Sequence, residues 1–358
     1  MSNMQVKLTK QQKIKKYALI GVVLLILCVL PFCLPTAYYV HVAIMCLFWA
    51  YMSTSWNMLC GFAGTLSLGH GIYVAIGAYV ATILLNTFGI TPWLGMIISC
   101  LVAAGVGVLI GYPIFNLRGA YYALSTVAIG EGIVVLLTNF REWKISDDLI
   151  IKIGGAEGLT MQTMNSPLYM QWTGKIPYYF MILVMLIIAL LVSSYVKKNK
   201  LGFQLAAVKD DEDAARALGI NVRSVKLKAA ALSAIFTGLG GVFYALLIRF
   251  LEPAAVASGA SMSNQIVFGA IVGGSGTVMG PAIGGLILNL VSSVIQFFLG
   301  GAISGLHLFI YGIIIVVMIL FKPTGLITIF TKLYNKYMGI TIVEGLEEEK
   351  DEVVNDGK

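Results

Sequence analysis

Residues 177–196 read PYYFMILVMLIIALLVSSYV, a run of twenty positions without a charged side chain. At about 1.5 Å per residue, a helix of this length covers the roughly 30 Å hydrocarbon thickness of a bilayer. Lys197 and Lys198 follow directly, and a strongly charged segment occupies 209–223. The stretch therefore predicts a membrane-spanning helix that ends at a charged loop.

The composition of the whole chain agrees with this interpretation. Hydrophobic residues make up 58% and charged residues only 11% of the 358 positions, and the mean hydropathy is +0.88. A soluble domain carries about 25% charged residues. We predict an all-α polytopic membrane protein with about ten transmembrane helices, the eighth of them short and the third broken by glycines. The predicted spans are 17–35, 38–59, 63–86, 94–113, 119–140, 177–196, 226–249, 264–274, 281–299 and 305–321.

Charge placement predicts the orientation. Most of the 24 basic residues fall in segments that share one side if the N-terminus is cytoplasmic, which is the positive-inside pattern. We expect both termini to be cytoplasmic in a multi-pass protein of the bacterial cytoplasmic (inner) membrane. The predicted parts are a basic N-terminus at 1–16, a permease domain at 17–321 with an outer loop at 141–176 and a cytoplasmic coupling loop at 197–225, and a tail at 322–358 with a disordered acidic end.

The charged segment KDDEDAARALGINVR at 209–223 carries the signals of a short docking helix. Asp210 or Asp211 can cap its first amides, and Gly219 can adopt the left-handed conformation that ends it. A narrow apolar face made of small side chains and one leucine suits insertion into a groove on a partner. Packing against the chain's own bundle is an equally weighted alternative. The residues of this candidate coupling helix are Asp213, Ala214, Ala215, Leu218 and Gly219.

Glycine-rich runs at 61–71 and 269–281 contain polar residues and favour broken helices beside a cavity, because unwound backbone is tolerated in a membrane only there. Glu131 lies within an apolar span, where it is either a pathway or gating residue or a hydrogen-bond partner of Ser67, Asn57 or a nearby serine. The latter is slightly favoured. The candidate pathway residues are Asn57, Ser67, His70, Glu131, Gly276 and Thr277.

The sequence contains no G-x-x-x-x-G-K-[ST] nucleotide-binding motif, no catalytic constellation and no metal-ligand spacing. We therefore expect a transport subunit and not an enzyme, without cofactor or metal. If transport uses ATP, a separate subunit hydrolyses it. The net charge of +7 follows from the positive-inside bias and does not indicate nucleic-acid binding.

Several motifs resemble the permease subunit of branched-chain amino-acid ABC importers of the LivM type, over nearly the whole length from about 45 to 326. The coupling segment, Asp213-Ala-Ala-x-x-x-Gly219, looks like that family's EAA motif with Asp in place of Glu. The other matching motifs are Gly64-x-x-Ser-Leu-Gly-His70 with Gly77-Ala-Tyr79, Leu117-Arg-Gly-x-Tyr121 leading to Gly130-Glu131, Gly154-Gly-x-x-Gly-Leu159, and Gly273-Gly-x-Gly-Thr-x-x-Gly-Pro281.

The resemblance implies a cytoplasmic helix at Asp213, Ala214, Ala215 and Gly219 that fits a cleft in an ATPase. It implies two ATP-hydrolysing subunits, a second permease subunit and an external substrate-binding protein as partners, besides membrane lipids. The substrate would be a branched-chain or other hydrophobic amino acid. Ala120 replaces an acid that often follows the Arg-Gly pair in the family, so urea or short amides are alternative substrates. A proton-coupled secondary transporter using Glu131 is the alternative from another class.

Overall fold

The computed structural model describes residues 10–146, 149–299, 306–321 and 324–338. The chain divides into two compact units, one of residues 1–33 with 327–358 and one of residues 34–326. The first unit contains α1 (Lys10–Cys33) and α15 (Ile327–Met338). The basic end before residue 10 and the predicted disordered acidic end at 344–358 lie outside the described residues.

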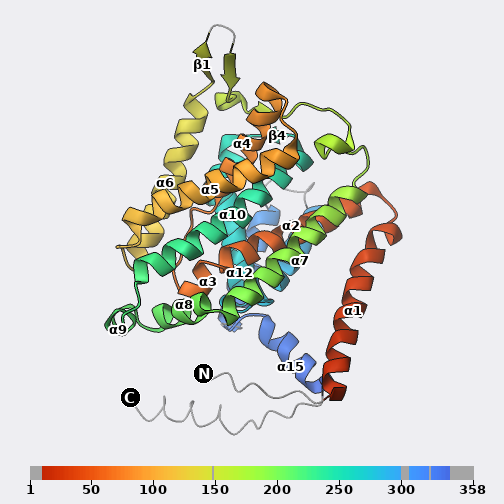
Figure 1. Ribbon diagram of the computed structural model, residues 1–358. Coiled ribbons are helices and arrows are strands. Elements are labelled where there is room, and N and C mark those ends of the chain that lie inside the picture. The colour runs from red at the N-terminus through yellow and green to blue at the C-terminus, as the bar shows by residue number, and fades with distance from the viewer. Residues whose placement is uncertain (1–9, 147–148, 300–305, 322–323, 339–358) are drawn as a thin grey trace. The chain divides into compact units, whose positions relative to one another are not determined.

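The second unit holds the other elements, and Figure 1 shows them in chain order by colour. Its helices are α2 (Ala37–Asn57), α3 (Cys60–Ala63), α4 (Gly71–Phe88), α5 (Pro92–Ile114), α6 (Ala120–Asn139), η1 (Gly155–Glu157), η2 (Pro167–Tyr169), α7 (Ile176–Lys198), α8 (Lys200–Asp210), α9 (Glu212–Ala217), α10 (Val222–Ile248), α11 (Pro253–Ala257), η3 (Gly259–Ser263), α12 (Asn264–Gly273), α13 (Gly280–Leu299) and α14 (Leu306–Phe321).

Within the described residues, eight helical stretches are long and apolar enough to cross a membrane. They coincide with the predicted spans from the second to the ninth, which confirms the polytopic all-α fold. The first predicted span falls on α1, whose apolar part is Gly21–Cys33, and the tenth falls on α14. The total of ten spans and the side of each terminus stay predictions.

The prediction of a short eighth span at 264–274 was wrong. The helical stretch begins at Pro253 with α11, continues through the wider turn of η3 and ends with α12 at Gly273. Ser258 and Gly259 interrupt the apolar run, which concealed the beginning of the span in the sequence. The predicted break in the third span is confirmed, since residues 64–69 are not helical and α4 begins at Gly71.

The α2 helix lies at the centre of this unit. Every residue from 46 to 63 is buried, and α2 packs against α7, α10, α12 and α13. The α10 helix in turn packs along α4 and α5. The core is thus made of membrane-type helices that cover α2 on several sides.

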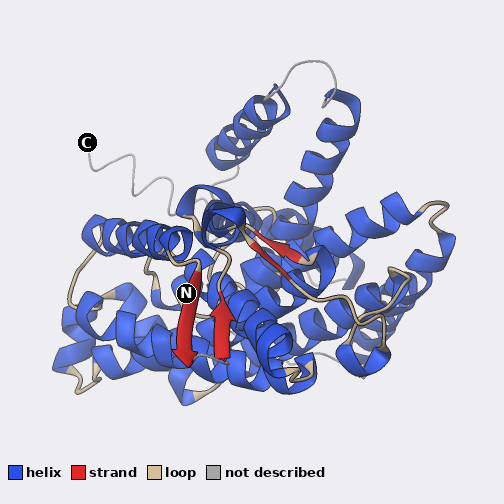
Figure 2. Ribbon diagram, turned by 90° about the horizontal axis from the view of Figure 1, so that it is seen from above, coloured by secondary structure: helices blue, strands red, loops and turns tan. Residues whose placement is uncertain are grey.

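Strands among the described residues are confined to two short antiparallel pairs (Figure 2). In one pair, β1 (Glu142–Ser146) and β2 (Leu149–Lys152) form a hairpin in the predicted outer loop. In the other, β3 (Leu159–Thr160) pairs with β4 (Phe250–Leu251), which follows α10. The second pair fixes the predicted outer loop to the end of α10.

Glycines let several helices touch backbone to backbone. A Cβ atom added to Gly77 on α4 would lie 1.9 Å from the carbonyl oxygen of Gly238 on α10, and one added to Gly241 would lie 2.1 Å from the carbonyl oxygen of Val74. Small residues at helix crossings are the usual basis of association in lipid. The α4–α10 contact therefore depends on the absence of side chains at these positions.

We expect Gly77→Ala to destabilise the protein by about 1–3 kcal/mol, because the added methyl group must separate α4 from α10. Thermal unfolding of the purified protein in mild detergent measures the effect as a lower Tm. Gly105→Ala in α5 is the matched control, since an added Cβ there meets nothing within 4 Å. Equal Tm values for the two variants would contradict the assigned crossing.

Candidate functional site

The charged segment forms α9, and its two ends are built as the sequence predicts. The Asp211 carboxylate accepts hydrogen bonds from the backbone N–H groups of Asp213 (2.8 Å) and Ala214 (3.0 Å). This settles the choice between Asp210 and Asp211, because only the side chain of Asp211 is the N-cap. Gly219 has a φ of 80°, so it takes the left-handed conformation directly after the last turn.

The predicted apolar face of α9 does not exist as a single surface. Ala215 is buried against Val208 of α8 and Val222 of α10, whereas Leu218 is 80% exposed and Ala214 is exposed. The helix ends at Ala217, so Leu218 lies outside its regular turns and its side chain leaves the face that Ala215 occupies. Ala215 therefore packs within the chain, and Leu218 is the apolar side chain that α9 presents outward.

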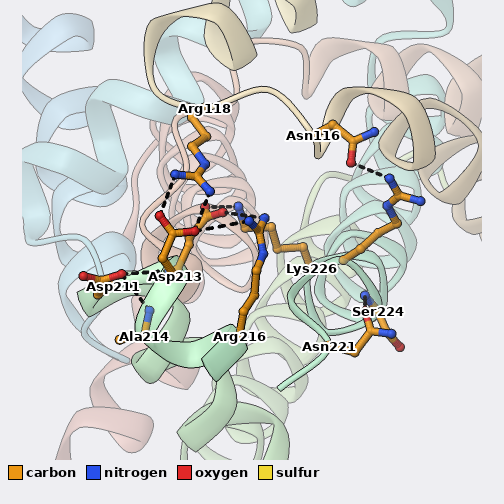
Figure 3. Close-up of polar contacts among 11 residues, drawn as sticks. Asn116, Arg118, Asp211, Asp213, Ala214, Arg216, Asn221, Ser224 and Lys226 are labelled. Atoms are coloured by element: carbon orange, nitrogen blue, oxygen red, sulfur yellow. Dashed lines mark hydrogen bonds and ion pairs between the residues drawn. The ribbon is translucent and has the colours of Figure 1, made fainter. Parts of the chain in front are cut away.

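An ion pair joins α9 to the linker between α5 and α6 (Figure 3). The Arg118 guanidinium donates to both carboxylate oxygens of Asp213, at 2.7 and 3.0 Å. This two-point geometry is the strongest form of the Arg–carboxylate pair. The hydrogen bonds and charge of Arg118 lower the pKa of Asp213, and Arg216 at 3.3 Å adds to this shift. Asp213 is therefore ionised throughout the neutral pH range.

A second ion pair joins α9 to α10. The Lys226 ammonium contacts the Glu212 carboxylate, and the Lys226 side chain is only 2% exposed. Arg216 also approaches Glu212, at 3.6 Å. Removing one partner of a buried pair leaves an uncompensated charge and costs several kcal/mol. The first turn of α9 is thus fixed to α10 by a contact that resists separation.

The α5–α6 linker is also bound to α10. Arg223 donates to the side-chain oxygen of Asn116 and lies over the Tyr112 ring, 4.9 Å from its centroid. Figure 3 shows Asn116 and Arg118 reaching α10 and α9 from the same linker. Together with the Glu212–Lys226 pair, these contacts join α9, α10 and the α5–α6 linker into one polar cluster, which we call the coupling cluster.

Three predicted pathway residues meet where α2 ends. The Asn57 side chain accepts from the N–H of Gly276 at 2.7 Å and donates to the carbonyl of Thr277 at 2.8 Å. Lys197 donates to the Gly276 carbonyl at 2.9 Å, and Lys209 donates to the Gly61 carbonyl at 3.3 Å. Side chains therefore bond to backbone groups in α3 and in the segment between α12 and α13.

Two other predicted residues, Ser67 and His70, are buried together. The Ser233 hydroxyl donates to the Ser55 carbonyl at 2.8 Å, so the 2.9 Å contact between Ser233 and His70 Nε2 needs a proton on Nε2. His70 Nδ1 is then the acceptor for the Ser67 hydroxyl at 3.2 Å. The ring has a partner on each nitrogen.

Glu131 lies apart from both groups. Its carboxylate accepts from the Ser258 hydroxyl at 2.9 Å and from the Gly259 N–H at 3.1 Å. These residues form the junction between α11 and η3, so Glu131 caps the break in that span. The hydrogen bond to a nearby serine is the predicted interaction, and the bond to Ser67 or Asn57 is absent from the contacts of this side chain among the described residues.

By their hydrogen bonds, the predicted residues thus fall into three groups. Sequence reasoning gave no role to Arg118, and it treated Lys226 only as the start of a span. A signal was present for Arg118, which stands alone between two long apolar runs, whereas Lys226 lies between two other basic residues, Arg223 and Lys228. The sequence does not show which carboxylate either basic side chain contacts.

The chain forms a bundle of apolar spans, some of them interrupted and capped by side chains. Ion pairs hold a short charged helix at the surface of this bundle. Together these features define a multi-pass membrane permease. The chain belongs to the family described as "branched-chain amino acid transport system / permease component", whose model matches residues 38–319. A permease component of this family is a transport subunit that works with ATPase and substrate-binding partners, and the protein is a multi-pass component of the cytoplasmic membrane.

The chain is similar to named relatives from bacteria. The high-affinity branched-chain amino acid permease LivM of Escherichia coli K12 is 27% identical over 304 residues, which are 80% of this chain and 69% of the relative. LivM of Salmonella typhimurium is 25% identical, with the same two shares. The nucleoside permease NupC of Lactococcus lactis is 25% identical over 68% of this chain and 76% of its own. No solved structure matches the chain significantly.

We expect Asp211→Ala to increase amide hydrogen exchange in residues 212–219, because loss of an N-cap costs about 1 kcal/mol, or roughly fivefold in local opening. Hydrogen–deuterium exchange of the detergent-solubilised protein measures this directly. Asp210→Ala is the matched control, since it removes an exposed neighbouring carboxylate that is not the cap. An equal increase in both variants would refute the role of Asp211.

Proposed function

We propose that the chain is the permease subunit of an ABC importer for branched-chain or other hydrophobic amino acids, driven by separate ATPase subunits. In this proposal both termini and the 197–225 loop are cytoplasmic, and α9 is the helix that an ATPase contacts. A second permease subunit completes the pathway, two ATPases bind below, and an external binding protein delivers the substrate. The family to which the chain belongs supports this function.

The observation that carries the proposal is that one side of α9 is fixed to the bundle and the other side is exposed. Its inner side is fixed, because Ala215 packs against α8 and α10 and Glu212 pairs with the buried Lys226. Its outer side is free for contact, since Leu218 is 80% exposed. A helix of six residues is unstable alone, so the tethers to the bundle give it a fixed position. An ATPase that binds Leu218 would then displace the whole coupling cluster.

The contacts of α8 supply a route from α9 to the helix breaks. Lys209 precedes the N-cap of α9 by two residues and donates to the carbonyl of Gly61. Lys197, at the end of α7, donates to Gly276. Displacement of the 197–225 loop would therefore act on both broken segments at once, which suits a rocking motion between two packed arrangements.

The substrate class is the more specific part of the proposal. The family description and the LivM relatives favour branched-chain amino acids. The relative that is named as a nucleoside permease makes a nucleoside the competing substrate, and urea or short amides stay open as alternatives. Uptake of labelled L-leucine, uridine and urea by cells that produce the complete transporter distinguishes them, and uptake of uridine alone would overturn the amino-acid assignment.

Co-purification tests the subunit organisation. The chain is isolated in mild detergent from cells that express it together with its neighbouring genes. The masses of the bound proteins are measured by native mass spectrometry. We expect two ATPase subunits and a second permease in the complex. Isolation without any nucleotide-hydrolysing subunit would contradict the proposal.

We expect Leu218→Glu to reduce leucine uptake about tenfold or more, because a buried apolar contact with the ATPase becomes an unpaired charge. The amount of protein in the membrane should not change, since the side chain is exposed in the chain alone. Leu168→Glu is the matched control, because Leu168 is 62% exposed in the predicted outer loop. Retention of ATPase subunits on a chain that carries Leu218→Glu would count against α9 as the contact.

We expect Glu131→Gln to leave uptake largely intact, within about threefold of the wild type. The amide oxygen of Gln keeps the acceptor that Ser258 and Gly259 use, so only a charge-assisted share of these bonds is lost. ATP-driven uptake by the complete transporter in liposomes is the measurement. A proton-coupled transporter would instead lose uptake with this variant and would respond to a pH gradient without ATP.

A further inference from the structure

A cavity of about 290 Å³ lies between α2, α12 and α13, away from the coupling cluster and from the three groups of predicted pathway residues. It was not found by sequence reasoning. Its lining combines aromatic, aliphatic, amide, hydroxyl and imidazole side chains. The lining includes His41 and Trp49 of α2, Gln265 of α12, and Gly285, Asn289 and Gln296 of α13.

The α13 helix contributes a polar face to this cavity. Four polar residues follow one another at spacings of three, one and three positions, which places them on one side of the helix. They are Asn289, Ser292, Ser293 and Gln296. Polar side chains within a span avoid lipid and face the bundle interior or water. The polar face of α13 therefore indicates a wet cavity.

The α2 helix contributes an unsatisfied group. The Nδ1 atom of His41 is buried and has no hydrogen-bond partner among the described residues. A buried polar atom without a partner is unfavourable. The His41 imidazole therefore lines the cavity beside the α13 amides and hydroxyls, with its Nδ1 atom covered by neighbouring atoms.

The cavity has one open end. Exposure falls along both walls, from Tyr38 to the buried Trp49 on α2 and from Gln296 to the buried Gly285 on α13. At the buried end the two helices touch, because a Cβ atom added to Gly285 would lie 2.5 Å from the Trp49 carbonyl oxygen. The cavity is thus a half-open vestibule that narrows toward a glycine contact between α2 and α13, which we call its floor.

The chemistry of the lining selects a class of ligand. The described lining residues include no Asp, Glu, Lys or Arg, and Lys175 is close enough to the lining residue His41 to interact with it electrostatically. Amide N–H and hydroxyl groups suit a carboxylate, while amide oxygens and the Trp49 ring suit an ammonium group. Val42, Met45 and Leu288 supply an apolar wall. A small zwitterion with an aliphatic side chain satisfies all three requirements.

We propose that this vestibule is where the permease receives its substrate, a neutral zwitterionic amino acid with an aliphatic side chain, from the outer side of the membrane. The inference rests on the proposed function and adds a site to it. In the proposed topology α2 begins and α13 ends on the outer side, so the open end faces the binding protein. Opening of the Gly285–Trp49 contact would pass the substrate inward.

Cysteine labelling in the complete transporter tests the site. Ser293→Cys is compared with Leu290→Cys, which lies on the same helix and is 46% exposed but does not line the cavity. Both are made in a variant whose five native cysteines are replaced and whose leucine uptake is confirmed. A membrane-impermeant maleimide should label Ser293→Cys at least about tenfold faster, because the thiolate forms readily only in water. Added L-leucine should slow that labelling, and uridine should not.

Transport kinetics provide an independent readout. We expect Asn289→Leu and Gln296→Leu each to raise the KM for leucine about tenfold, since a hydrogen bond to a charged group is lost. Leu290→Met is the matched control and should keep the wild-type KM.

Two results together would overturn the site: equally slow labelling at both cysteines, and normal KM values in both leucine variants. If wild-type leucine uptake is intact, the proposed function still stands. The face would then be one that lipid or the second permease covers. Protection by uridine together with absent wild-type leucine uptake would overturn the amino-acid assignment and the proposed function together.

Discussion

The structure depends on one constraint, which is that every backbone N–H and C=O group inside a membrane needs a partner within the protein. Helical hydrogen bonding is interrupted between α12 and α13 and between α11 and η3, so the free backbone groups there need side-chain partners. Asn57 serves the break before α13, and Glu131 serves the break between α11 and η3. The polar residues that interrupt apolar spans are therefore explained first as caps of broken helices.

The same constraint connects the breaks to the charged loop. Lys197 and Lys209 donate to carbonyls of the broken segments, and both belong to the helices that lead into α9. In the proposed mechanism, a lysine that caps a carbonyl in this position would also transmit displacement, because moving the helix without the capped segment would break the hydrogen bond. The proposed coupling would thus use the same contacts that cap the carbonyls.

The parts that could be predicted from the sequence are those encoded locally. Spans follow from apolar runs, and the cap at Asp211 and the left-handed Gly219 follow from the chemistry of neighbouring residues. The parts that could not be predicted depend on long-range packing. The direction of Ala215 is set by Val208 and Val222, and the vestibule needs α2 and α13 side by side although they are far apart in sequence. Periodicity shows that a helix has a polar face, but it does not show what that face meets.

The α13 helix links the two ends of the proposed mechanism. Its first residue, Gly280, donates its N–H to the hydroxyl of Thr277, in the loop that Asn57 and Lys197 hold. Five residues further, Gly285 makes the floor of the vestibule against Trp49. A helix transmits displacement along its axis because its hydrogen bonds are internal and continuous. A shift of the loop at 274–279 would therefore move the floor of the vestibule directly, and the glycine contact there is close enough for a small displacement to change it.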